Sequence, residues 1–146
     1  MRKCIAFITL IIFTVIAFNA CKKEEITTQQ FVQRHIIGRW PLKARIEITS
    51  KNGDTTQNDT TRFTKDDKLF PIDTVIFSAN GTYIIKESSF KYSVNHTGDS
   101  LSISSTPPKH WNIKFLRPQS IILSNERREK VGADIFIYYS EEQLIK

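Results

Sequence analysis

Cysteine is scarce in this chain, which has only two among its 146 residues. Cys4 and Cys21 both lie near the amino terminus, and the sequence after residue 21 has none. That part of the chain can form neither a disulfide nor a cysteine-ligated metal site. Small exported domains often depend on disulfides, so a folded domain here must be held together by its hydrophobic core.

Glycine and histidine are also rare, with five and three residues. No glycine-rich loop that cradles phosphate is present, and no G-x-S-x-G nucleophile motif occurs. His35, His96 and His110 have no second ligand at the spacing of a metal site. We therefore expect no catalytic residues, no metal and no cofactor, and we predict that the protein is not an enzyme.

Basic residues outnumber acidic ones by 21 to 15, which gives a formal net charge of +6. Many of them gather in the polar stretch 126–133, which we expect to be a loop, and around Trp111. No nucleic-acid recognition motif is present, and the export signal described next would keep the protein away from chromosomal DNA, so we expect no nucleic-acid partner. Solubility is the simplest role for the excess charge, with contacts to anionic lipid head groups or glycans as the alternative.

The amino terminus has the pattern of an export signal. Arg2 and Lys3 precede an apolar run from Ile5 to Phe18 that contains no charge. A membrane-spanning helix needs about 20 apolar residues, and this run is shorter. We interpret residues 1–20 as a signal peptide rather than a transmembrane anchor.

The end of this segment, Ala20-Cys21, resembles a bacterial lipobox, in which a small residue precedes the cysteine that becomes lipid-modified. The resemblance implies a mature protein that begins at acylated Cys21 and is held on a membrane by its acyl chains, which anchor stably when there are two or more. The residue after the cysteine is Lys22, not the aspartate of the inner-membrane retention signal, which favours the outer membrane, on its periplasmic face or at the cell surface. Residues 21–27 are then a lipidated tether.

A short helix is expected next, because Thr27 and Gln30 have the spacing of a capping box and apolar residues follow at helical intervals. Gly38 is expected to end it. After Pro41 the period changes from 3.6 to 2, and residues 42–49 alternate between apolar and polar side chains as in a half-buried strand.

The rest of the chain is predicted to be β-structure. Asn52-Gly53 indicates a turn, and Ala79-Asn80-Gly81 is the clearest hairpin signal. Residues 54–68 are polar, with one weak strand at 62–64, while further strands are expected at 73–78, 82–87, 90–95, 100–104, 111–116, 120–125 and 134–140. Eight or nine short strands at regular spacing are typical of an antiparallel barrel or sandwich.

Three segments resemble the lipocalin-like domains of bacterial lipoproteins: the G-x-W element Gly38-Arg39-Trp40, the hairpin at 77–83, and residues 92–94 followed by 98–103. The resemblance implies an all-β, antiparallel up-and-down barrel of about eight strands with a short N-terminal helix, over residues 28–146. In this family Gly38 and Trp40 would close one end of the barrel. Lipocalins also place an arginine after the last strand to stack on that tryptophan, and the tail 141–146 has none.

In a barrel, alternation would point a set of apolar side chains inward. A small barrel is either filled by such side chains or holds one small ligand. We therefore expect a lipid-anchored envelope lipoprotein that binds a small hydrophobic ligand; the alternative is a packed barrel with a structural role or an envelope protein partner. The candidate cavity-lining residues are Ile46, Ile48, Phe77, Tyr83, Tyr92, Ile103, Phe115, Ile137 and Tyr139.

Overall fold

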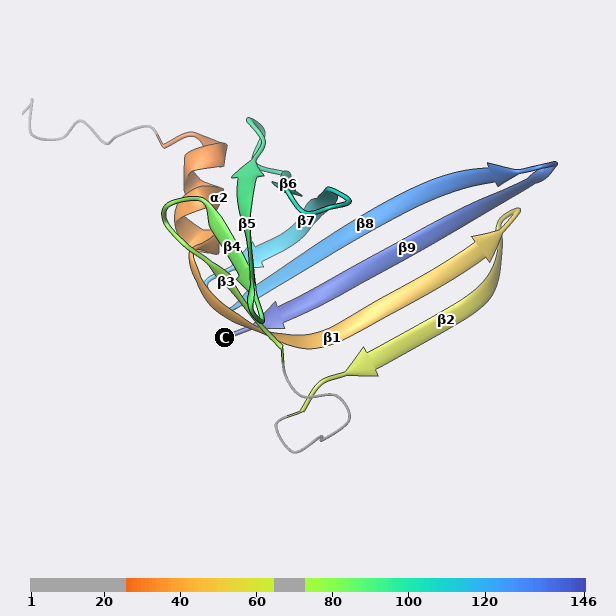
Figure 1. Cartoon of the computed structure of the whole chain (residues 1–146), viewed down its shortest axis with the longest axis horizontal. Coiled ribbons are helices and arrows are strands. Elements are labelled where there is room, and N and C mark those ends of the chain that lie inside the picture. The colour runs from red at the N-terminus through yellow and green to blue at the C-terminus, as the bar shows by residue number, and fades with distance from the viewer. Residues whose placement is uncertain (1–25, 65–72) are drawn as a thin grey trace, which may run out of the picture.

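The computed structural model describes residues 26–64 and 73–146, and within them the chain is almost entirely β-structure (Figure 1). The signal segment, Cys21 and most of the tether lie outside the described residues. One helix, α2 (Thr28–Ile36), is followed by nine strands. These are β1 (Gly38–Lys51), β2 (Asp54–Arg62), β3 (Thr74–Phe77), β4 (Thr82–Ile85), β5 (Ser88–Val94), β6 (Ser100–Ile103), β7 (Lys109–Arg117), β8 (Ser120–Val131) and β9 (Asp134–Ile145).

The strands form an antiparallel barrel with one extra strand. From β3 to β9 each strand pairs with the next along the chain, and β1 closes the ring because it pairs with both β3 and β9. The extra strand is β2, which lies along the outer edge of β1. The all-β prediction of an eight-stranded up-and-down barrel with a short N-terminal helix is confirmed.

Strand β1 changes partners along its length. Residues 38–41 pair with β3, whereas residues 42–51 pair with β9 and residues 44–51 also pair with β2. Pro41, which has no N–H to donate, lies at the change, and Leu42 N donates to the Asp73 carbonyl at 2.7 Å. The barrel is therefore short, and its longest strands continue past it.

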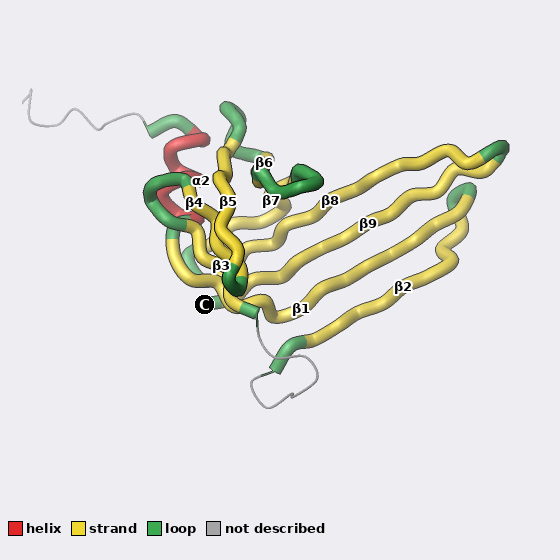
Figure 2. Tube along the Cα trace, in the orientation of Figure 1, coloured by secondary structure: helices red, strands yellow, loops and turns green. Residues whose placement is uncertain are grey.

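We call this continuation the wing: residues 44–51 of β1, all of β2, residues 125–131 of β8 and residues 134–142 of β9. These four segments lie side by side and sweep away from the helix and the short strands (Figure 2). Pairing between β7 and β8 stops at Ser124, so β8 and β2 are the two outer edges of the wing.

The helix and Trp40 fill one end of the barrel. Thr27 Oγ1 accepts a hydrogen bond from Gln30 N, which confirms the predicted capping box. Val32 and Ile36 point into the core, where Trp40 is 0% exposed. The indole Nε1 of Trp40 donates to the Ile36 carbonyl at 2.7 Å, so the last turn of the helix and the first strand are joined inside the core.

The other face of Trp40 is covered by the carboxyl-terminal residue. The Nζ of Lys146 lies 4.0 Å from the centre of the Trp40 ring. Gly38 passes so close that a Cβ there would be 3.0 Å from the same Nζ, and its φ of +139° favours glycine. A lysine thus occupies the place where the lipocalin pattern has an arginine, although the sequence contains no arginine in this tail.

Two predicted loops are strands in the structure. Residues 54–62, predicted to be polar and mostly irregular, form all of β2, and residues 126–131, predicted to be a basic loop, extend β8. Apart from Val131 both segments are polar on both faces, so the alternation that marks a strand in a sequence is missing. Hydrogen bonding to β1 and β9 makes them strands. By contrast, the predicted hairpin is confirmed, with Gly81 N donating to the Ser78 carbonyl.

The sheet register defines two faces of the wing. Leu42 and Leu144 pair directly, and both are buried in the core. Side chains alternate along a strand, so Glu142 and Tyr138 lie on the same side of β9 as Leu144. We call this side the concave face. Ile137 and the other odd-numbered residues of β9 from 135 to 143 lie on the opposite side, which we call the outer face.

A β-bulge reverses the expected direction of the side chains in β1. The register with β9 slips by one residue between Leu42 and Ala44, so that Arg45 pairs with Glu142 on the concave face. Ile46 and Ile48 therefore lie on the outer face, although alternation counted from Leu42 predicted them to line the interior. One extra residue in a strand exchanges its two faces.

A second β-bulge lies in β7. Ile113 pairs with buried Leu123, the register then slips, and Phe115 pairs with Ile122 on the outer face. Phe115, like Ile137 and Tyr139, does not point into the core as predicted. Alternation was counted through an extra residue, Lys114, that only the pairing with β8 reveals.

Candidate functional site: a cleft at the barrel mouth

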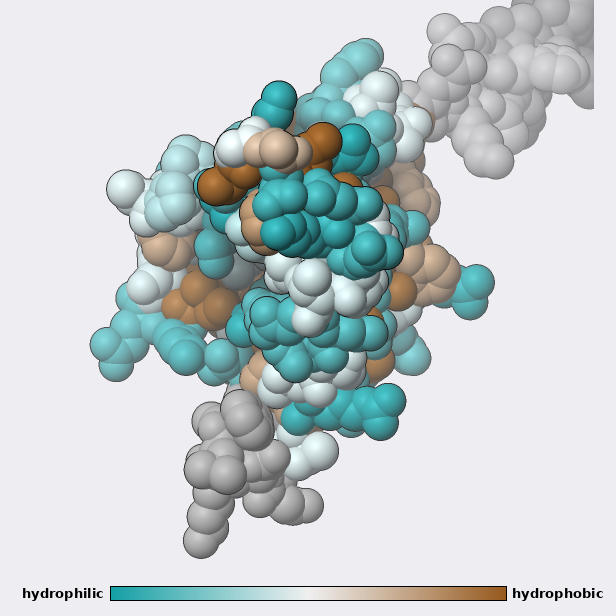
Figure 3. Space-filling view, turned by 90° about the vertical axis from the view of Figure 1, so that its right-hand side faces the viewer, coloured by the Kyte–Doolittle hydropathy of each residue, from teal (hydrophilic) through white to brown (hydrophobic). Residues whose placement is uncertain are grey.

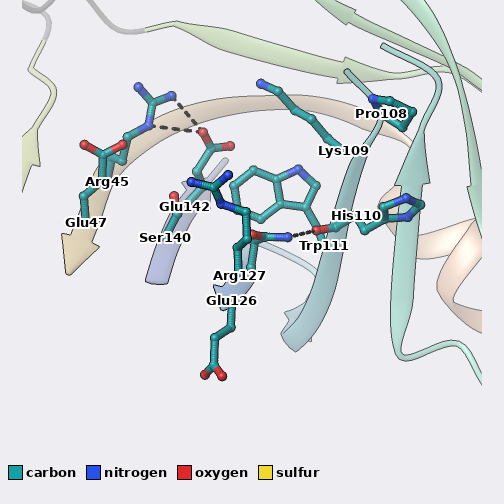
Figure 4. Close-up of a pocket in the computed structure, with 11 residues that line it drawn as sticks. Arg45, Glu47, Pro108, Lys109, His110, Trp111, Glu126, Arg127, Ser140 and Glu142 are labelled. Carbon is teal, nitrogen blue, oxygen red and sulfur yellow. Dashed lines mark hydrogen bonds and ion pairs between the residues drawn. The ribbon is translucent and has the colours of Figure 1, made fainter. Parts of the chain in front are cut away.

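An open cleft lies where the barrel meets the concave face of the wing. Its volume is about 660 Å³, and its walls come from β1, β7, β8 and β9. The first residues of β7 form one wall, and the concave faces of the three long strands form the other (Figure 4). A cleft of this size suits a small molecule. The lining residues are Arg45, Glu47, Pro108, Lys109, His110, Trp111, Asn125, Glu126, Arg127, Ser140 and Glu142.

An ion pair forms the floor of the cleft. Arg45 donates to Glu142 Oε1 from Nη2 at 2.7 Å and from Nε at 3.2 Å. The Glu142 side chain is only 10% exposed, against 36% for Arg45. The two charges lie on neighbouring strands in direct register, so the pair joins β1 to β9 and leaves the floor nearly neutral.

Trp111 forms the apolar wall. It is the third residue of β7, pairs with core residue Leu101 and is 8% exposed. In the described residues nothing accepts a hydrogen bond from its indole Nε1, so this donor is available to a ligand. The guanidinium of Arg127 lies over the Tyr138 ring, 4.6 Å from its centre, and Figure 4 shows the Lys109 side chain extending over the cleft.

The rim is polar, and one of its contacts sets the position of β7. Asn125 Nδ2 donates to the His110 carbonyl, which fixes the start of β7 against β8. Glu126 points away from the other side chains in Figure 4 and pairs with Arg128, with Arg128 Nε 2.9 Å from Glu126 Oε1. The acidic charge at this edge is therefore directed out of the cleft.

A second hollow of about 290 Å³ adjoins the cleft on the barrel side, and Lys109 lines both. Its walls include three aromatic or aliphatic side chains that face the barrel interior, Tyr83, Phe90 and Ile103. Burial, and then the negative charge of Glu142, raise the pKa of Tyr83 well above its usual value of 10.0. The Tyr83 hydroxyl has no hydrogen-bond partner among the described residues and stays protonated at neutral pH.

The structure divides the nine candidate cavity residues into two groups. Phe77, Tyr83, Tyr92 and Ile103 face the barrel interior, where they pack with the core. Of these, Tyr83 and Ile103 also line the second hollow. The remaining five, namely Ile46, Ile48, Phe115, Ile137 and Tyr139, lie on the outer face, as described above.

Among the described residues the interior is filled beside the helix and opens into the cleft at the mouth. Side chains less than 2% exposed fill it, among them Trp40, Phe77, Leu101 and Leu144. The polar half of the cleft was missed by sequence reasoning. Arg45 and Glu142 are 97 residues apart, and no local pattern links them. The only sequence signal was the cluster of basic residues around Trp111.

Comparison with known proteins found no matching family model, no matching curated protein and no matching solved structure. Within residues 26–64 and 73–146, no three histidine, cysteine, aspartate or glutamate side chains gather as they would around a metal ion. The helix in this part of the chain is too short and polar to cross a membrane.

Proposed function

We propose that the chain is a lipid-anchored lipoprotein of the bacterial envelope whose lipocalin-like barrel binds a small hydrophobic ligand at its mouth. The observation that carries the proposal is the cleft of about 660 Å³ beside Trp111, which opens at the end of a filled barrel. Its wall offers an aromatic surface and an unused indole donor, and the adjoining hollow offers a second unused donor at Tyr83. The ligand would therefore have an apolar body and at least one hydrogen-bond acceptor.

The ligand is tested by native mass spectrometry of protein purified from its host and by displacement of a fluorescent fatty acid. Trp111→Ala should weaken probe binding by about tenfold or more, because buried aromatic anchors commonly contribute 2 kcal/mol or more to binding. Asn112→Ala is the matched control, since the next residue of β7 lies on the outer face. Protein that is purified without a bound ligand and binds no probe would contradict the proposal. Equal probe binding by the Trp111→Ala and Asn112→Ala variants would also contradict it.

The lipid anchor rests on the lipobox resemblance and is tested separately. Cys21→Ser should abolish palmitate labelling, whereas Cys4→Ser should leave the labelling unchanged. Unchanged labelling of the Cys21→Ser protein would exclude this anchor without bearing on the cleft.

The alternative function, binding of an envelope protein, is favoured by the free edge of β2. This strand pairs only with β1 among the described residues, and it contains neither proline nor lysine, the residues that commonly protect an edge. Phe63 N donates to the Lys43 carbonyl, so by alternation the N–H of Thr60 points away from β1. A partner strand added at this edge would use that group.

Crosslinking in cells tests this alternative. Thr60→Pro removes an outward N–H without breaking the pairing to β1, so it should abolish a crosslinked complex that Thr60→Val preserves. Equal crosslinking by both variants would exclude strand addition at β2.

A further inference from the structure

The outer face of the wing carries an uncovered apolar strip. It consists of Ile46 and Ile48 of β1 with Ile135, Ile137 and Tyr139 of β9, and Ile48 pairs directly with Tyr139. Ile135 is 47% exposed, and the other four side chains are partly exposed. The wing strands pack against the strands beside them in the sheet, and no described helix lies over this face. Apolar patches of this kind mark contact surfaces in soluble proteins.

The charges on the two faces differ in sign. With the adjoining residues of β7 included, the register places four basic and two acidic side chains on the outer face and four basic and six acidic ones on the concave face. Figure 3, which views the molecule from the tip of the wing, shows hydrophobic residues exposed beside hydrophilic ones at this end. The basic residues of the outer face are Arg62, Lys114, Arg128 and Lys130, and its acidic ones are Glu126 and Glu141.

The few acidic groups on the outer face are already engaged. Glu126 binds Arg128, and Glu141 accepts from the Tyr139 hydroxyl at 2.6 Å, with Lys114 Nζ 3.8 Å away. Lys130 has no acidic partner in the part of the chain that the structure describes, and the same is true of Arg62. The apolar strip is thus bordered by basic charge that is free to bind an anionic surface.

The excess of basic charge on the outer face distinguishes between two possible partners, a second copy of the chain and a lipid surface. Two copies packed face to face would bring an excess of basic side chains together from both partners, and like charges at an interface oppose association. An anionic lipid surface provides the complementary charge, and its interfacial region accepts isoleucine and tyrosine side chains. We propose that the outer face of the wing docks onto the surface of an anionic lipid bilayer, with the apolar strip in the interface and the basic residues at the head groups. The proposal depends on neither the cleft nor acylation of Cys21.

The test places a fluorescent reporter on each face of one strand. Cys4→Ser and Cys21→Ser are introduced into the full chain, and then a single cysteine at either Ile137 or Tyr138 is labelled with an environment-sensitive dye. Residues 1–20 supply an apolar segment that holds every variant at the vesicle. The signal then reports which face meets lipid. Quenching by spin-labelled lipid is compared in vesicles of phosphatidylcholine alone and vesicles with added phosphatidylglycerol.

Docking predicts a blue shift and quenching for the dye at position 137 and no change for the dye at position 138. The effect at position 137 should occur only in vesicles that contain phosphatidylglycerol. Lys130→Glu should lower the docked-to-undocked ratio at least about fivefold, because each basic residue near an anionic surface contributes about 1 kcal/mol. Arg127→Glu, on the concave face, should not lower it. High salt should act like Lys130→Glu.

Three results would overturn the proposal: equal quenching at both positions, no quenching at either, or a blue shift that rises with protein concentration without vesicles. The last would show that a second copy covers the face. A second pair on β1, Ile46→Cys and Glu47→Cys, repeats the comparison if a β9 variant fails to fold, which circular dichroism detects.

Discussion

The barrel and the wing share strands but not surroundings. At one end of β9, Leu144 is 0% exposed and packs with Trp40 and Ile36. Toward the other end, Ile137 lies on a face that no described element covers. Leu144 lies on the inner face of β9 and Ile137 on the opposite face, as alternation requires. Only Leu144 is covered by other core side chains. Alternation therefore shows that a strand has two faces, while burial depends on what closes over them.

The largest expected effect contrasts the two regions directly. Leu144→Ala should lower the free energy of unfolding by about 2 to 5 kcal/mol, because it leaves a cavity in a closed core. Ile137→Ala, on the same strand, should cost about 1 kcal/mol, since its side chain is already partly in water. Urea denaturation measures both. Equal losses would mean that the wing is as well packed as the barrel.

The ion pair at the junction should give the next largest effect. Arg45→Ala leaves the Glu142 carboxylate nearly buried without its charged partner, which should cost about 1 to 2 kcal/mol, less than for a fully buried pair because Arg45 is partly exposed. Replacing both residues, as Arg45→Met with Glu142→Leu, should recover most of the loss. A double variant no more stable than Arg45→Ala would show that the charges themselves hold the junction.

Tyr83 supplies a pH test of the barrel mouth. Its pKa is raised in the folded protein, so the unfolded chain ionises first once the pH exceeds about 10. Stability should then fall with rising pH, by up to about 1.4 kcal/mol per pH unit from this residue. Tyr83→Phe should lose that part of the slope between pH 10 and 11. Identical pH slopes for the two proteins would place the hydroxyl in contact with water.

The smallest effect is expected at the closed end of the barrel. Lys146→Ala removes the cation above Trp40 and should cost about 0.5 to 1 kcal/mol, as for exposed cation–π contacts. Lys146→Arg should retain the stability, because a guanidinium stacks on an indole equally well. Thermal unfolding of the three proteins provides the comparison, and an arginine variant as unstable as the alanine variant would argue against stacking.

Sequence reasoning succeeded where the signal is local. The capping box of α2 and the Asn80-Gly81 turn depend on residues within one turn of each other, and both are present. It failed for β2, whose polar residues have no alternation, and for Arg45 and Glu142, which meet only through the pairing of β1 with β9. The cleft depends on that long-range pairing, so its polar half could not be predicted.

The amino-acid sequence by itself determined a strand-rich chain without cysteine after residue 21, a capped helix ahead of the first strand, and Trp40 as a central core residue. The tertiary structure decided that the barrel closes through β1, that the long strands continue as a wing, and which face of the wing is apolar. The physical reason is the extra residue in β1 and in β7. Each moves the following side chains to the other face, and hydrogen bonding to the neighbouring strand, not the local order of residues, determines where the extra residue lies.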